Sequence, residues 1–278
     1  MDLPDISAGK IVRINMPSQF VDKRPVDVWL PDSYPSEEKY SVIYMNDGGS
    51  LFDSSKIWVN QEWKIDENVS DLLKKEKLKN TIVIGIHNNG MKRASEYLPE
   101  KALAFLPDST KQLLDSLIPK GYLADNYLKF VVTELKPFID SNFEVYTDSK
   151  HTFIMGSSMG GLISMYAICE YPTVFGGAAC LSTHWIGIFK NNKEIPAAFL
   201  SYMSNNIPNP INHKIYFDTG DQGLDAFYPP YQREVDKLMQ LAHFDSKNWI
   251  TLYFEGEDHS KTAWSKRIDK PLIFLLGK

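Results

Sequence analysis

A serine between closely spaced glycines is the first group in this sequence whose setting suggests chemistry. An apolar, strand-like run over 151–155 leads into Gly-Ser-Ser-Met-Gly-Gly over 156–161, and only Ser158 has glycine both two residues before and two residues after it. A serine on a sharp strand-to-helix turn presents its hydroxyl for attack, and glycines let the neighbouring backbone pass closely. We therefore expect Ser158 to be a nucleophile. The alternative is a glycine-rich turn without chemistry.

A serine hydroxyl needs a general base, and the base needs a third group that orients it. Among the six histidines, only His259 follows the last strand-like run. The chain order nucleophile, acid, histidine therefore favours His259 as the base. Its alternative role is that of a polar loop residue among acidic neighbours.

The acid should follow the seventh strand-like run, in a loop that offers three aspartates. Asp218 lies within the tail of that run, which is too early. Asp221 and Asp225 could both reach an imidazole, and spacing alone does not choose between them. Either could instead cap a turn or a helix.

Hydrolysis through a tetrahedral intermediate also requires two N–H donors for the oxyanion. The turn itself supplies the amide of Met159, the residue after the nucleophile. The loop after the third strand, Asn-Asp-Gly-Gly-Ser over 46–50, should supply the second donor. We expect Gly49 in this role, with Ser50 as the next choice. The alternative is a simple tight turn.

Strand-like and helical patterns alternate along most of the chain. The runs with strand character are 11–14, 26–30, 41–45, 81–86, 151–155, 177–181, 214–217 and 250–254, and helical character is clearest over 126–143, 161–171 and 231–242. Such alternation predicts an α/β fold with a mostly parallel, doubly wound sheet and helices on both faces. The short connection between the first two runs predicts an antiparallel hairpin at the N-terminal edge. We expect residues 1–278 to form a single domain.

Two connections are longer than such units need, namely 88–122 and 183–213. They follow the fourth and sixth strand-like runs, on the side where α/β sheets bind ligands, and we expect them to form walls of a substrate pocket. Candidate aromatic contacts for a substrate are Trp63 and Trp185, followed by Tyr97 and Phe105. Each could equally belong to the core.

Composition narrows the range of partners and cofactors. The net charge of −5 and the lack of a dense Lys/Arg cluster argue against nucleic acid, and no apolar stretch is long enough for a membrane span. Cys169 and Cys180 have small apolar neighbours, which favours reduced, buried thiols.

No signal peptide is visible at the N-terminus, so a cytoplasmic location is expected. No His, Cys and carboxylate cluster suggests a metal, and no cofactor is expected. The oligomeric state cannot be read from the sequence.

Several motifs together resemble the putative esterase family, the esterase D-like branch of α/β hydrolases that includes feruloyl, acetylxylan and siderophore esterases. The matching residues are Val28-Trp-Leu-Pro31 with Tyr34, Val42 to Gly48 with Leu51-Phe-Asp53, Glu62-Trp63 with Asp66, Met155 to Gly161, Leu224-Asp225, and His259-Ser260 with Trp264. The resemblance implies an α/β-hydrolase fold and Asp225 as the acid. Members often carry His where Asn46 stands and Gln where Gly49 stands.

The combined expectation is a serine carboxylic ester hydrolase that works through Ser158, His259 and Asp225 and an acyl-enzyme intermediate. Its substrate would be a small, acetyl or aryl (feruloyl-like) ester. A siderophore esterase or an acyltransferase would use the same triad. A catalytically silent binding module is the non-enzymatic alternative.

Overall fold

The computed structural model describes residues 2–53, 61–118 and 120–278, and eight strands in these ranges form one sheet. The strand order is β1-β2-β4-β3-β5-β6-β7-β8. The strands are β1 (Lys10–Met16), β2 (Arg24–Leu30), β3 (Ser41–Asn46), β4 (Thr81–Ile86), β5 (Thr152–Ser157), β6 (Gly177–Leu181), β7 (Lys214–Thr219) and β8 (Trp249–Tyr253). β2 pairs antiparallel with both β1 and β4, and all other pairs are parallel. The predicted mixed sheet with an antiparallel N-terminal edge is confirmed.

Successive residues of the central strands point into two separate hydrophobic cores. In β3, Val42 and Tyr44 belong to one core, while Ile43 and Met45 belong to the other. All four are buried, because a parallel strand needs cover on both faces. This is why these strands read as continuous apolar runs rather than as alternating patterns.

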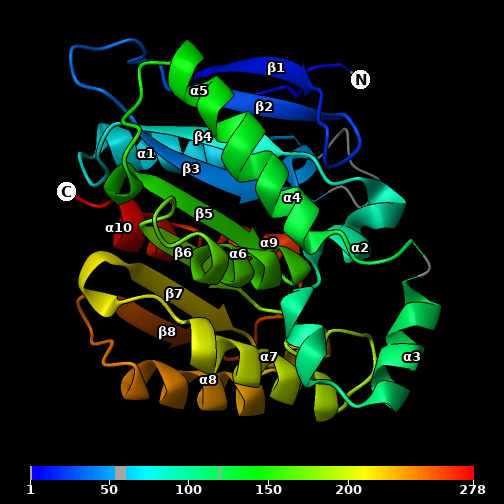
Figure 1. Cartoon of the computed structure of the whole chain (residues 1–278). Helices are drawn as coiled ribbons and strands as arrows, with labels where there is room; N and C mark the ends of the chain where they lie inside the picture. Colours follow the sequence, from blue (N-terminus) through cyan, green and yellow to red (C-terminus); the bar gives the residue numbers. More distant parts are fainter. Residues whose placement is uncertain (1, 54–60, 119) are drawn as a thin grey trace.

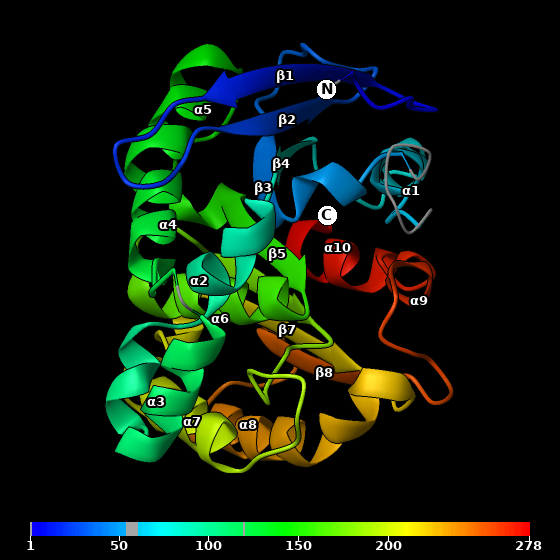
Figure 2. The ribbon, with the colours of Figure 1, turned by 90° about the vertical axis from the view of Figure 1, so that its right-hand side faces the viewer.

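Helices cover both faces of the sheet (Figures 1 and 2). On one face lie α4 (Ala124–Phe130), α5 (Lys136–Asn142), α6 (Met159–Glu170), α7 (Glu194–Asn206) and α8 (Pro229–Leu241). On the other lie α1 (Ile65–Lys74), α9 (Lys261–Ser265) and α10 (Asp269–Leu276). The doubly wound arrangement predicted from the alternation of patterns is therefore confirmed.

The predicted helix over 126–143 is interrupted in its middle. Residues Val131–Leu135 adopt a π-helical turn between α4 and α5. Pro137, at the start of α5, has no amide hydrogen to donate to the helix. A π-helical turn accommodates such a local break in the α-helical hydrogen bonds. The sequence predicted the helical segment, whereas the hydrogen-bond pattern inside it depends on this proline.

The two long connections pack against each other. The first contains η2 (Gly90–Lys92), α2 (Arg93–Tyr97), η3 (Lys101–Phe105) and α3 (Asp108–Leu117), and η3 packs against α7 of the second. A buried ion pair between Arg24 of β2 and Glu96 of α2, with two N–O distances of 2.7 Å, ties the first connection to the sheet. The start of this connection is thereby held near the carboxyl ends of the strands.

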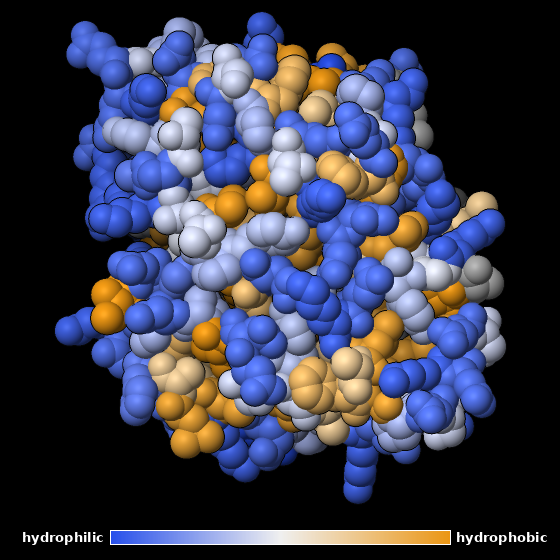
Figure 3. Space-filling model, viewed as in Figure 1, coloured by the Kyte–Doolittle hydropathy of each residue, from blue (hydrophilic) through white to orange (hydrophobic). Residues whose placement is uncertain are grey.

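The outer surface in Figure 3 is largely hydrophilic, with apolar side chains in separate small groups. None of the helices in the described ranges combines the length and hydrophobicity needed to cross a membrane.

Candidate active site

Ser158 stands at the turn between β5 and α6. Its φ of 56° and ψ of −125° are strained for a residue with a side chain. The surrounding backbone holds this conformation: the Ser158 amide donates to the Leu181 carbonyl at 2.9 Å, and the His184 amide donates to the Ser158 carbonyl at 3.2 Å. The side chain of Ser158 lines a pocket.

The glycines around Ser158 are required by close backbone approach. A Cβ on Gly156 would lie 2.6 Å from the carbonyl carbon of Gly160, in the first turn of α6. A Cβ on Gly160 would lie 3.2 Å from the Asp47 carboxylate. The spacing of glycines around Ser158 in the sequence therefore has a steric cause.

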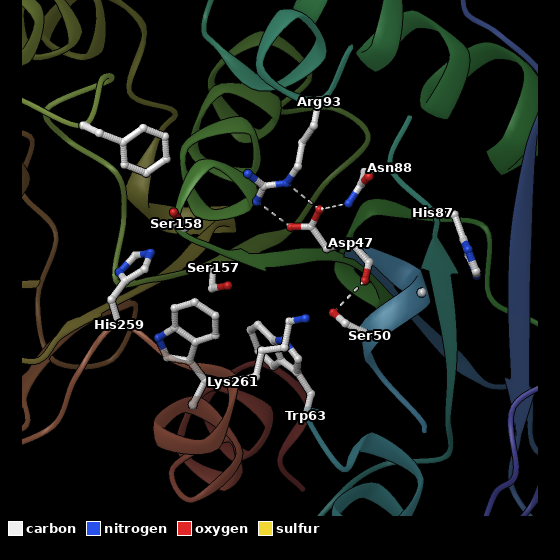
Figure 4. Close-up of a pocket in the computed structure, with 13 residues that line it drawn as sticks. Asp47, Ser50, Trp63, His87, Asn88, Arg93, Ser157, Ser158, His259 and Lys261 are labelled. Atoms are coloured by element: carbon white, nitrogen blue, oxygen red, sulfur yellow. Dashed lines mark hydrogen bonds and ion pairs between the residues drawn. The ribbon is translucent and has the colours of Figure 1, made fainter. Parts of the chain in front are cut away.

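His259 follows β8 and forms a close contact with Asp225. The Nδ1 of His259 lies 2.5 Å from Oδ1 of Asp225, whose side chain is fully buried. Ser158 and His259 both line the pocket, as labelled in Figure 4, although they come from the start of α6 and the loop after β8. The structure thus brings together a serine, a histidine and a carboxylate that are far apart in the sequence.

The two other aspartates of this loop region lie elsewhere. Asp221 is half-buried, and its carboxylate accepts hydrogen bonds from Tyr253 Oη at 2.7 Å and the Gly256 amide at 2.9 Å. Asp218 is buried in an ion pair with Arg267 at 3.0 Å. Of the three, only Asp225 contacts His259.

A buried hydroxyl supports the second oxygen of Asp225. Ser182 Oγ donates to Asp225 Oδ2 at 2.6 Å and accepts from Trp264 Nε1 at 2.9 Å and from Arg267 Nη2 at 3.0 Å. The Gly220 amide also donates to Asp225 Oδ2, at 2.8 Å. Sequence reasoning missed Ser182 and Arg267, and no local pattern marks them.

The loop after β3 forms the other wall of the pocket. Its first residue, Asp47, has a φ of 61°, and a short 3₁₀ helix follows over Gly48–Ser50. The Ser50 amide donates to the Asp47 carbonyl at 3.0 Å, so it is already engaged. Gly49 lines the pocket, and a Cβ there would lie 3.2 Å from His87 Nδ1. Met159, the other expected donor, opens α6, and its side chain packs in the core.

The pocket has a volume of about 570 Å³, within the size range of small-molecule sites. Trp63 lines it and packs on Trp264, with 5.5 Å between ring centroids. The pocket-lining Phe189 belongs to the second long connection, and Asn88 and Arg93 belong to the first. Both connections therefore contribute to the pocket wall.

The other aromatic candidates lie outside this pocket lining. Trp185 is buried in the core, where its indole donates to Gln232 Oε1 at 3.0 Å. Tyr97 is also buried, and its hydroxyl accepts a hydrogen bond from the Asp47 amide at 3.3 Å. Phe105, in η3, is partly exposed on the surface. Aromatic residue type alone did not distinguish core positions from pocket positions.

An ion pair that sequence reasoning missed borders the pocket. Nε and Nη2 of Arg93 each lie 2.7 Å from an oxygen of Asp47, and Asn88 donates to the same carboxylate at 2.7 Å. Burial would raise the pKa of Asp47, but its partners outweigh burial and hold the pKa below its ordinary value. The only sequence signal for Arg93 was its place in a connection predicted to border the pocket.

His184 is buried close to His259. Its Nδ1 lies 2.6 Å from the Tyr228 hydroxyl, and its Nε2 has no hydrogen-bond partner among the described residues. Burial, with smaller effects from His259 and Arg93, lowers the pKa of His184 to about 3. This side chain is therefore neutral at ordinary pH.

Comparisons with curated proteins give relatives of low identity. The chain is 28% identical to the uncharacterized protein YbbA of Bacillus subtilis over 164 residues, which is 58% of each chain. It is 25% identical over 274 residues to an endo-1,4-beta-xylanase/feruloyl esterase of Xylanibacter ruminicola. That alignment covers 96% of this chain and 31% of the relative.

Solved structures share the fold at still lower identity. A ferulic acid esterase superposes with a TM-score of 0.69 at 18% identity, covering 97% of this chain and 99% of the other. The enterobactin esterase FES of Shigella flexneri superposes with a TM-score of 0.68 at 16% identity, covering 98% of this chain and 59% of the other. These similarities confirm the predicted α/β-hydrolase fold.

The family described as Putative esterase matches residues 18–275, which is nearly the whole chain. The match includes β2 to β8 and every pocket residue described above. The chain therefore belongs to the Putative esterase family, and ester hydrolysis is the activity that this membership carries.

Proposed function

We propose that this protein hydrolyses carboxylic esters through a triad of Ser158, His259 and Asp225. The observation that carries the proposal is the 2.5 Å contact between His259 Nδ1 and Asp225 Oδ1, beside the strained turn that presents Ser158. A general base held by a buried carboxylate is the arrangement that activates a serine hydroxyl.

In the first half of the reaction, His259 Nε2 takes the proton of Ser158 Oγ as the oxygen attacks the ester carbonyl carbon. The carbonyl π electrons move onto oxygen and form a tetrahedral oxyanion. When the intermediate collapses, the carbon–oxygen bond to the alcohol breaks, and His259 returns the proton to the leaving alkoxide. Asp225 keeps the imidazole in one tautomer and stabilises its charged form throughout.

In the second half, water takes the place of the alcohol. His259 removes a proton from water as it attacks the acyl-enzyme, and Ser158 leaves with that proton. The amides of Met159 and Gly49 would hold the oxyanion in both halves. Gly49 is a better second donor than Ser50, because the Ser50 amide already donates to Asp47.

The pocket favours small or aryl acyl groups. The indoles of Trp63 and Trp264 pack together along its wall, and the ring of Phe189 also faces it. Flat apolar walls suit a phenyl or cinnamoyl group, as in the feruloyl esters named for the Xylanibacter ruminicola relative, and leave room for an acetyl group. We therefore propose methyl ferulate and p-nitrophenyl acetate as first substrates.

The test is hydrolysis of these two esters by the wild type and by Ser158→Ala, His259→Ala and Asp225→Asn. We expect each variant to lose on the order of 10⁴-fold or more in kcat, since the three residues act as a unit. Circular dichroism would check that each variant folds.

Asp221→Asn is the matched control, because Asp221 is in the same loop region but contacts Tyr253 instead of His259. It should retain activity within about twofold of the wild type. Activity that survives Ser158→Ala, or a loss in Asp221→Asn as large as that in Asp225→Asn, would refute the assignment.

A further inference from the structure

The charged groups that line the pocket do not balance. The described part of the lining contains one carboxylate, Asp47, and two basic side chains, Arg93 and Lys261. Its net charge is therefore positive with neutral histidines, although the chain as a whole has a formal net charge of −5. A locally positive pocket on a protein of negative net charge attracts anionic ligands.

Lys261 is the cation of this lining for which the described residues supply no partner. It is half-buried, and its amine forms no hydrogen bond or ion pair with any of the described residues. Figure 4 shows its side chain extending into the pocket, with the amine directed toward the loop that carries Asp47 and Ser50. Burial, with a smaller contribution from Arg93, lowers the pKa of Lys261, and the attraction of Asp47 only partly opposes this. The charged form of Lys261 is thus incompletely compensated by the protein.

Arg93 supplies a second hydrogen-bond donor, the Nη1 of its guanidinium. Its Nε and Nη2 are occupied by Asp47, which leaves Nη1 without a described partner. Nη1 is not among the buried polar atoms that lack a partner, so it is not fully enclosed. The lining that contains Ser158 thus also holds an ammonium and a guanidinium N–H that no described residue pairs.

A nearby lysine on the same short helix region is already paired. Lys266, at the end of α9, is mostly exposed and lies 3.1 Å from Glu257. Lys261 differs from it in both respects: it lines the pocket, and no carboxylate of the described residues pairs with it. An anion on the substrate would pair with the Lys261 ammonium, because desolvated lysine charges in proteins are normally paired.

We propose that this pocket binds esters whose non-reacting end carries a carboxylate, with Lys261 as the residue that selects for that charge. The inference rests on the proposed ester hydrolysis and specifies its substrate class. A carboxylate suits the site better than a phosphate dianion, because a second negative charge would face Asp47.

The experiment compares charged and neutral esters of similar size. One pair varies the acyl side, mono-4-nitrophenyl adipate against 4-nitrophenyl hexanoate, and the other varies the alcohol side, 3-carboxyphenyl acetate against phenyl acetate. For each pair we define the charge ratio as kcat/KM for the anionic ester divided by kcat/KM for the neutral ester. This ratio cancels differences in the fraction of folded enzyme.

In at least one pair, Lys261→Met should lower the charge ratio by about tenfold relative to wild type, which corresponds to about 1.4 kcal/mol. Lys261→Glu should lower it further, because it places a negative charge where the carboxylate would bind. The wild-type ratio should also fall as NaCl is raised, since salt screens the attraction. Lys266→Met, the matched control, should leave both ratios unchanged.

The possible failures are distinguishable. Ester hydrolysis that depends on Ser158 but shows charge ratios unaffected by Lys261→Met in both pairs would overturn this inference and leave the proposed function standing. If the wild type hydrolyses none of the four esters, nor methyl ferulate nor p-nitrophenyl acetate, the proposed function fails and the inference fails with it.

Discussion

At the scale of single residues, Ser182 shows how a buried hydroxyl can support a catalytic site without lining it. A serine hydroxyl can donate one hydrogen bond and accept two, and Ser182 uses all three, toward Asp225, Trp264 and Arg267. This leaves Asp225 Oδ2 with two donors and Oδ1 for His259. Ser182 is therefore a positioning residue for the proposed acid.

Ser182→Ala should lower kcat for p-nitrophenyl acetate by about tenfold while KM changes by less than about twofold, because the interaction acts on the base and not on ester binding. It should also lower the free energy of unfolding by about 1 to 3 kcal/mol, since a buried acceptor loses its donor. Steady-state kinetics and urea denaturation measure the two effects.

Ser204→Ala is the control for this prediction, because Ser204 is exposed on α7 and bonds only to the Ser201 carbonyl of its own helix. It should change neither quantity appreciably. A Ser182→Ala enzyme with wild-type kcat would show that Asp225 needs no such support.

At the scale of elements, the site depends on how closely β3, β5 and α6 approach one another. The side-chain amide of Asn46 donates to the Gly160 carbonyl at 3.2 Å and to Ser164 Oγ at 2.9 Å, and its oxygen accepts from Tyr127 at 2.6 Å. Asn46 thus links the end of β3 to the first turns of α6. These hydrogen bonds account for a polar side chain buried at this position.

Gly156→Ala should disrupt this arrangement, because its Cβ would lie 2.6 Å from the Gly160 carbonyl carbon and both backbones are fixed by the elements around them. We expect a loss of about 1 to 3 kcal/mol in the free energy of unfolding, as for other overpacked sites, together with lower kcat. Urea denaturation followed by circular dichroism measures the stability.

Gly121→Asn serves as its control, because Gly121 has a φ of 74° that asparagine tolerates and no atom lies within 4 Å of its added Cβ. Its stability should stay within about 0.5 kcal/mol of wild type. Equal stabilities of Gly156→Ala and wild type would contradict the steric account of the turn.

At the scale of the whole molecule, the sheet places side chains from distant segments against one another. Some of these side chains are titratable, and their burial opposes the charged form. His184 is buried near His259 and Arg93, with the Tyr228 hydroxyl on one nitrogen and, among the described residues, no partner on the other. Burial is the main cause that lowers its pKa, from an ordinary value of 6.5 to about 3. Folding therefore opposes protonation of this residue.

Between these two pKa values the unfolded chain binds a proton at His184 that the folded protein does not, so stability must fall as the pH is lowered. His184 alone should cost the wild type about 2 kcal/mol in the free energy of unfolding between pH 6.5 and pH 5. His184→Gln should show a correspondingly smaller loss over this window in urea denaturation. His243→Asn, at an exposed histidine with a φ of 64°, should retain the wild-type loss. A His184→Gln protein with the wild-type pH dependence would contradict this account.

The sequence by itself determined the fold class, the mixed sheet, its antiparallel edge and the family, because these follow from local patterns. Continuous apolar runs mark strands that are buried on both faces, and close backbone packing requires glycines around Ser158. The order of motifs along the chain also predicted Ser158 as the nucleophile and His259 as its base. Each motif used here consists of residues within a few positions of one another, and only the order of the motifs spans the chain.

Only the tertiary structure decided which distant side chains face the site. Asp221 and Asp225 are four residues apart in the same loop region, yet Asp221 bonds to the Gly256 amide and Asp225 contacts His259, which depends on how β7 and β8 position their loops. The same holds for Trp185, an aromatic residue in a predicted pocket wall whose side chain packs in the core. The pairing of Arg93 with Asp47 and the unpaired charge of Lys261 likewise arise from segments far apart in the chain, because charge neutralisation depends on distance in space and leaves no local pattern in the sequence.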